Sequence, residues 1–159
     1  MNKSHQDGFS LIELLIVVAI IGIVAAIAIP NLLASRRAAN EGSAQSSLRT
    51  LYSCEITYQS ATGLGEFGTI ADLRGDFLTD EILGSGNKSG YNFVATPSAA
   101  GVRPATFYTT AVPIITAGVG RTGTRRFGVT EDGVIHGDSL ALTPYADGAA
   151  VKAAPAVGN

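Results

Sequence analysis

The sequence predicts an α+β protein in which a long N-terminal helix, membrane-inserted over its first half, packs on a small antiparallel β-sheet of about four strands. Three observations support this prediction. Leu14 to Ile29 contains only Leu, Ile, Val and Ala, apart from one glycine. An alanine-rich amphipathic stretch follows this run. Several short segments rich in β-branched and aromatic residues come next, separated by glycine and proline.

The apolar run is long enough to cross a membrane. A helix from Phe9 to Ile29 would measure roughly 31 Å at ~1.5 Å per residue, close to the thickness of a bilayer's hydrocarbon core. Glu13 lies at its leading edge, where a lone carboxylate needs a partner or the lipid interface. No lysine or arginine occurs between Lys3 and Arg36, so we expect the partner cation to come from another group.

Two residues weaken the helix inside residues 9–30. Gly22 favours the helix less than alanine does, and Pro30 cannot donate an N–H to the carbonyl of Ala26. We expect the helix to bend or loosen at these positions.

The start of the chain carries a specific motif. Gly8-Phe9-Ser10-Leu11-Ile12-Glu13, followed by the apolar run with Gly22 and Pro30 in register, resembles the prepilin signature of type IV pilins and type II secretion pseudopilins. The resemblance covers about residues 3–37. The later strand pattern is also similar to pilin globular domains, although that similarity is less specific.

The resemblance implies how this end of the chain is used. It implies a leader over residues 1–8, cleavage between Gly8 and Phe9 by a prepilin peptidase/methyltransferase, and N-methylation of Phe9. It implies that Phe9 and Glu13 take part in assembly, and the freed Phe9 amine would supply the missing cation. It further implies a precursor pool in inner-membrane lipid, with the N-terminus inside, and a homo-oligomeric filament built by pilus or secretion machinery.

Two simpler interpretations of the apolar run stay open. An ordinary secretory signal peptide would be cleaved after Ala28, and a plain signal anchor would hold a domain at the membrane. Both fit less well, because secretory signals use shorter apolar cores and Glu13 lies in the leading edge. The flanking charges do not set an orientation, since Lys3 precedes the run while Arg36 and Arg37 follow it.

Composition excludes several classes of protein. The chain has 159 residues, a formal net charge of −2 and 15% charged residues, so nucleic acid is not an expected partner. The 19 glycines suit a loop-rich β domain. The single cysteine, Cys54, cannot form a disulfide within the chain. We expect it to be a small apolar residue on a helix face, with an intersubunit bond or a reactive thiol as the alternatives.

Residues 31–62 should form the amphipathic second half of the helix and end near Gly63. An apolar stripe able to pack on a sheet is formed by Leu48, Leu51, Tyr52 and Ile56. The opposite face, expected to be solvated or to meet neighbouring subunits, carries Arg36, Arg37, Asn40, Glu41, Gln45 and Arg49.

Residues 63–90 read as a loop region with one short helical turn at 79–83, capped by Thr79 and stopped by Gly84. Residues 91–139 should form the sheet, from strands at 91–96, 106–112, 125–130 and 133–136 in meander order. Asp132-Gly133 is the hairpin signal between the last two. The Ala/Gly/Pro-rich tail, residues 140–159, is expected to be loosely ordered.

No catalytic site is predicted, and no cofactor is expected. His136 is the only histidine after the leader, and Gly118–Gly123 has GxGxxG spacing without the surrounding βαβ pattern. Asp132 and Asp138 are weak candidates for calcium, which prefers six to eight oxygen ligands. A small basic cluster is formed by Arg121, Arg125 and Arg126 beside Phe127; we expect it to be a solvated strand edge, with DNA capture as the alternative.

The predicted function is therefore a structural pilin-like subunit, held in the inner membrane and then assembled into a cell-surface pilus. The first alternative is a pseudopilin of a type II secretion system, forming a periplasmic fibre. The second is a membrane-anchored binding module, such as a DNA-uptake minor pilin.

Overall fold

The computed structural model describes residues 9–139 and 143–157. Its elements are α1 (Leu11–Ala61), α2 (Ile70–Leu73), α3 (Glu81–Gly84), β1 (Asn87–Lys88), β2 (Tyr91–Pro97), β3 (Phe107–Pro113), β4 (Arg126–Thr130), β5 (Ile135–Asp138) and α4 (Gly148–Ala153). They fall into two compact units, divided between Ser35 and Arg36 within the span of α1.

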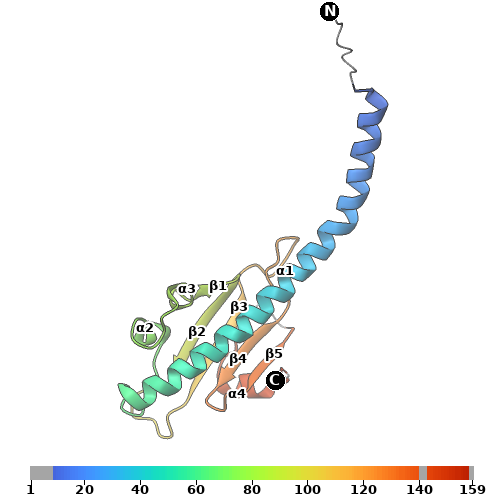
Figure 1. Cartoon of the computed structure of the whole chain (residues 1–159). Coiled ribbons are helices and arrows are strands. Elements are labelled where there is room, and N and C mark those ends of the chain that lie inside the picture. Colours follow the sequence, from blue (N-terminus) through green and yellow to red (C-terminus); the bar gives the residue numbers. More distant parts are fainter. Residues whose placement is uncertain (1–8, 140–142, 158–159) are drawn as a thin grey trace, which may run out of the picture. The chain divides into compact units, whose positions relative to one another are not determined.

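The second unit is a helix-and-sheet domain, as predicted. Its five strands are antiparallel in the order β1-β2-β3-β4-β5, one more strand than expected because the short β1 pairs with the start of β2. The Asp132-Gly133 hairpin joins β4 to β5, with Val129 opposite Ile135. Figure 1 shows the helix crossing one face of this meander sheet.

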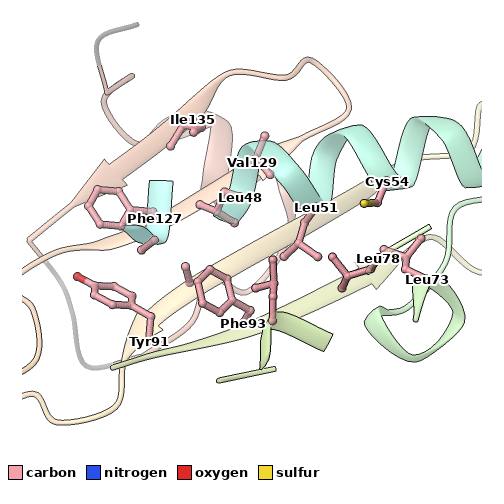
Figure 2. Close-up of a cluster of buried hydrophobic side chains, with 13 residues drawn as sticks. Leu48, Leu51, Cys54, Leu73, Leu78, Tyr91, Phe93, Phe127, Val129 and Ile135 are labelled. Carbon is pink, nitrogen blue, oxygen red and sulfur yellow. The ribbon is translucent and has the colours of Figure 1, made fainter. Parts of the chain in front are cut away.

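The core lies between α1 and the sheet. Alternation along β2 buries Tyr91, Phe93 and Ala95 on one face of the strand. Leu48 and Leu51 of α1 are fully buried, and Figure 2 shows them in the same cluster as the aromatic side chains of the sheet. Cys54 is buried at the end of this row, as expected for a small apolar residue, and its thiol donates to the carbonyl of Phe77.

The apolar stripe of α1 is rotated from the one predicted. Ile56 is 38% exposed, whereas Ala44 and Glu55 are fully buried. Leu48, Leu51 and the half-buried Tyr52 contact the core as predicted, but the buried row runs through residues 44, 48, 51 and 55, the three-to-four-residue spacing of one helix face, and leaves out Ile56. Glu41 is buried as well, so the prediction of a solvated position was wrong there.

The region predicted as loop with a short helix contains α3, and also α2 and β1. The α3 N-cap is Asp80, whose carboxylate accepts the N–H of Leu83, so the assignment of the cap to Thr79 was wrong. Asp80 also receives the ammonium of Lys88 at 2.7 Å, which fixes α3 against β1.

The described part of the tail is ordered, contrary to expectation. Val151 of α4 is fully buried, and it packs where a side chain on Gly128 of β4 would stand. Residues 154–157 run along β5, where Gly137 donates to the carbonyl of Pro155 and Val157 donates to that of Ile135. The sheet therefore carries α1 on one face and α4 on the other.

Candidate functional site

The N-terminal residues that the sequence singled out lie at the start of α1. Phe9 is 88% exposed. Glu13 is in the first turn of the helix, and its carboxylate accepts the Ser10 N–H at 2.9 Å. This bond satisfies one of the N–H groups that a helix N-terminus leaves without a partner. Gly8 lies outside the described residues, so the predicted cleavage position stays a prediction.

The first unit presents an uninterrupted apolar surface. Each large apolar side chain from Phe9 to Leu32 is more than half exposed, from 53% at Ile16 to 88% at Phe9. By length and composition this part of α1 can cross a membrane, and none of that window is buried within the chain. Apolar area on this scale requires a covering environment, either lipid or other helices.

Gly22 and Pro30 both lie inside α1, and the helix continues through both positions. A Cβ at Gly22 would meet no atom within 4 Å apart from its chain neighbours and the backbone of its own helix. The expected bend or loosening at these two residues stays a prediction.

The acidic calcium candidates are engaged elsewhere. Asp138 forms a two-point ion pair with Arg126, with both N–O distances at 3.0 Å, and Asp132 accepts the N–H of Val134 in the hairpin turn. In the described residues, no group of three or more His, Cys, Asp or Glu side chains is placed to hold a metal ion.

The basic cluster is also dispersed. Arg126 pairs with Asp138 and stacks over Tyr145 at 4.0 Å, while Arg125 pairs with Glu41 at 3.1 Å. The predicted cluster of three arginines is therefore not a single basic surface. His136 is held by the carbonyl of Ala154 at 2.7 Å, which is a structural contact to the tail. The Gly118–Gly123 stretch is part of the loop between β3 and β4.

The burial of two carboxylates of α1 was not predicted from the sequence. Glu41 accepts the N–H and hydroxyl of Thr124 at 2.7 and 2.6 Å, in addition to the Arg125 guanidinium. Burial alone would raise the pKa of Glu41, but the hydrogen bonds from Thr124 and Arg125 outweigh it and lower the pKa below its ordinary value. Glu41 lies seven residues before Leu48 and therefore on the same helix face, but its polarity argued against a buried position.

Glu55 is the more unusual group, because it is completely buried. One oxygen accepts the Gly68 N–H at 2.9 Å, and the other accepts no hydrogen bond from a described residue. Burial raises the pKa of Glu55 to about 7, although the Gly68 N–H opposes the shift. The spacing of Glu55 from Leu48 and Leu51 places it on the buried face of α1, and this spacing could have predicted its burial. Its polarity argued against a buried position.

Comparison with known proteins supports the N-terminal reading. The family model described as the prokaryotic N-terminal methylation motif matches residues 3–29. The chain is similar to the type IV major pilin protein PilA of Myxococcus xanthus, with 36% identity over 72% of this chain and 47% of that protein. It is also similar to the type IV wide pilus major component PilA4 of Thermus thermophilus, with 65% identity over 23% of this chain and 28% of the relative.

A third relative comes from a secretion system. The type II secretion system core protein G of Aeromonas hydrophila is 37% identical over 32% of this chain and 36% of that protein. The chain spans less than half the length of each of these three curated relatives. No solved structure is significantly similar to the chain.

Proposed function

Since the chain belongs to the type IV pilin and type II secretion pseudopilin family, we propose that it is a structural subunit that assembles through its N-terminal helix into a pilus filament. The observation that carries the proposal is the exposed apolar surface of residues 9–32, headed by the single carboxylate of Glu13. Lipid covers this surface in the stored precursor, and neighbouring helices cover it in the filament.

Processing creates the positively charged partner that Glu13 lacks. A prepilin peptidase cuts between Gly8 and Phe9 and methylates the new amine, which stays cationic. In the filament, the Phe9 amine of one subunit binds Glu13 of its neighbour and fixes the axial register between helices. Two unit charges ~4 Å apart attract by about 4 kcal/mol at an effective dielectric near 20, and desolvation offsets part of this.

Mass spectrometry of sheared filaments tests this mechanism. We expect a mature chain beginning with methylated Phe9. A chain beginning at Ile29 would mean ordinary signal-peptidase cleavage after Ala28 and would overturn the filament mechanism. The named relatives are pilus or secretion components rather than enzymes, and we propose that this chain likewise acts without catalysing a reaction.

The second unit should fold without the first, because its core is drawn from residues 44–151. We expect a fragment beginning at residue 38 to be a soluble monomer with native circular dichroism. Aggregation or loss of structure in this fragment would contradict the division between a folding part and an assembly part.

The pseudopilin is the second candidate, and the similarity to core protein G supports it. The pilus reading is preferred because the similarity to PilA extends over 117 residues and so reaches into the domain. Deleting the gene and imaging the cells separates the two: loss of long surface fibres supports the pilin, whereas retained fibres with a secretion defect support the pseudopilin.

A further inference from the structure

The loop between β3 and β4 exposes apolar side chains that contribute nothing to the core. In residues 114–121, named here the 114–121 loop, Ile114 is 55%, Ile115 47% and Val119 75% exposed. Val119 stands between Gly118 and Gly120, so it forms an apolar tip with small neighbours.

The base of this loop is fastened to the N-terminal end of the domain's part of α1. The side-chain amide of Asn40 donates to the carbonyl of Thr122 at 2.9 Å, and Glu41 accepts the N–H of Thr124 at 2.7 Å. The step from Thr124 to Thr122 runs beside the step from Glu41 to Asn40, so both segments run in the same direction here. The chain before Thr122 therefore leads toward residues 36–39 of the helix. Figure 1 shows a loop of the second unit beside this part of α1.

The charge of this region is positive. No acidic residue occurs between Leu14 and Asn40 or between Pro113 and Thr130. Arg36 and Arg121 are exposed, Arg37 is half-buried, and none of the three takes part in an ion pair among the described residues. By contrast, residues 66–81 hold five acidic side chains and one arginine.

Connectivity keeps this end of the domain near a bilayer that holds residues 9–29. From Ile29 to Asn40 the chain spans about 16 Å at ~1.5 Å per residue of helix, and a headgroup layer takes up roughly 5–8 Å of it. From Thr122 back to Val119, three residues reach at most ~10 Å. This reach is for an extended chain, whereas in the structure the Arg121 N–H donates to the carbonyl of Gly118, so Val119 meets the headgroups when this turn opens or when the membrane helix tilts.

We propose that the 114–121 loop, with Arg36, Arg37 and Arg121, is a docking surface for the anionic lipid surface of the membrane. The isoleucines and Val119 enter the headgroup boundary, and the arginines bind lipid phosphates. The contact holds the domain against the bilayer while the subunit is stored, and it is released when the helix moves into a filament. The inference rests on the proposed function only in requiring the N-terminal helix to be inserted in lipid.

The opposite end of the domain provides a matched control. Val102 lies in the loop between β2 and β3, follows a glycine and is 47% exposed. That loop is tied to Glu66, which accepts from Arg103 at 2.7 Å and from the Gly101 N–H at 3.1 Å. Glu66 follows the end of α1, whose stretch from Asn40 to Ala61 is about 31 Å long at ~1.5 Å per residue.

The test uses the full chain in vesicles of phosphatidylethanolamine and phosphatidylglycerol. In a Cys54→Ala background, an environment-sensitive fluorophore is attached to Val119→Cys, Val102→Cys or Ile20→Cys, and quenching by lipids with headgroup-level nitroxides is measured. We expect quenching at position 119, water-like emission at position 102, and a lipid environment at position 20. Circular dichroism checks that each labelled variant is folded.

Two results would overturn the proposal, and a third would overturn the function on which it rests. Water-like emission at both 119 and 102, with position 20 in lipid, would leave the filament function intact and remove the docking surface. Water-like emission at position 20 would show that the helix is not inserted, and the proposed function would fail instead. Quenching at 119 that disappears as protein is diluted in lipid would identify a second copy of the chain as the occupant.

A charge variant tests the lipid specificity. Since one basic residue at an anionic surface is worth about 1 kcal/mol, Arg121→Gln should reduce the equilibrium constant for contact roughly fivefold. The same variant should change nothing in vesicles of phosphatidylcholine alone. If Arg121→Gln and the parent protein are quenched equally in anionic vesicles, Arg121 is not part of the docking surface. If the parent is quenched as strongly in phosphatidylcholine vesicles as in anionic ones, the contact does not require anionic lipid.

Discussion

The two halves of α1 are both helical and both rich in apolar residues, yet they are used in opposite ways. In the first half, Leu15 is 59% exposed and Ile16 is 53% exposed. In the second half, Leu48 and Leu51 are fully buried against the sheet. Apolar content alone therefore does not say whether a helix stabilises its own domain. What matters is whether the same chain supplies a covering surface.

The carboxylates of the two halves also differ in how many partners their own chain supplies. Glu41 receives hydrogen bonds from the backbone and side chain of Thr124 and an ion pair from Arg125, all within its own domain. Glu13 is exposed, and the structure gives it one hydrogen bond, from the Ser10 N–H. Glu13 therefore has capacity for a partner outside the chain, whereas Glu41 does not.

The largest expected effect is on assembly. Glu13→Val should leave the precursor inserted in the membrane and reduce the yield of sheared filament nearly to zero, because the Phe9 amine of the neighbour loses its counter-charge. Glu81→Val, which removes an exposed carboxylate from α3, is the control and should assemble normally. Normal filament yield from Glu13→Val cells, at equal subunit level, would show that Glu13 is only an interfacial carboxylate.

The next effect compares one residue type in both halves. Leu51→Ala should lower the free energy of unfolding of the domain by about 2–5 kcal/mol, since it empties a fully buried site. Leu15→Ala should leave the domain's unfolding unchanged, because this side chain touches none of the core. Both are measured by thermal unfolding of the full chain in one detergent. Equal destabilisation by the two changes would contradict the separation of the halves.

Glu55→Gln should remove a pH dependence of stability. The folded pKa of Glu55 is about 7 against an ordinary 4.5, so between these values the folded domain holds a proton that the unfolded chain has lost. Stability then falls as pH rises through this window. At pH 8 the variant should be more stable than the parent by up to about 3 kcal/mol, and near pH 4 this advantage should vanish.

Urea unfolding of the fragment beginning at residue 38, from pH 4 to pH 8, measures this difference. A parent protein whose stability is flat between pH 5 and 7 would contradict the buried, partly satisfied carboxylate.

Glu41→Gln should have the smaller effect and the opposite pH dependence. Because the folded pKa of Glu41 lies below its ordinary value, its contribution is present above the unfolded pKa and is lost as pH falls through the folded pKa. At pH 7 the variant should be less stable by about 1–3 kcal/mol, and the gap should narrow below about pH 4.5. The same urea experiment checks this, and a gap that widens in acid would refute it.

The features that depend on local pattern could be predicted from the sequence. The apolar run, Glu13 at its edge and the Gly8-Phe9 motif are contiguous, so they can be read without a structure. The main strands could be predicted in the same way, because an alternating pattern and a turn such as Asp132-Gly133 depend on the backbone conformation of only a few consecutive residues. The fold class and the position of the candidate assembly residues were therefore predictable.

Contacts between residues far apart in the chain could not be predicted and are seen only in the folded protein. Glu41 and Arg125 are 84 positions apart, so their pairing has no local signal. The tail, rich in Ala, Gly and Pro, is ordered because Gly128 and Gly137 leave room for Val151 and Val157 to pack on the sheet. Close packing is a property of the space between segments, and that space exists only once the chain has folded.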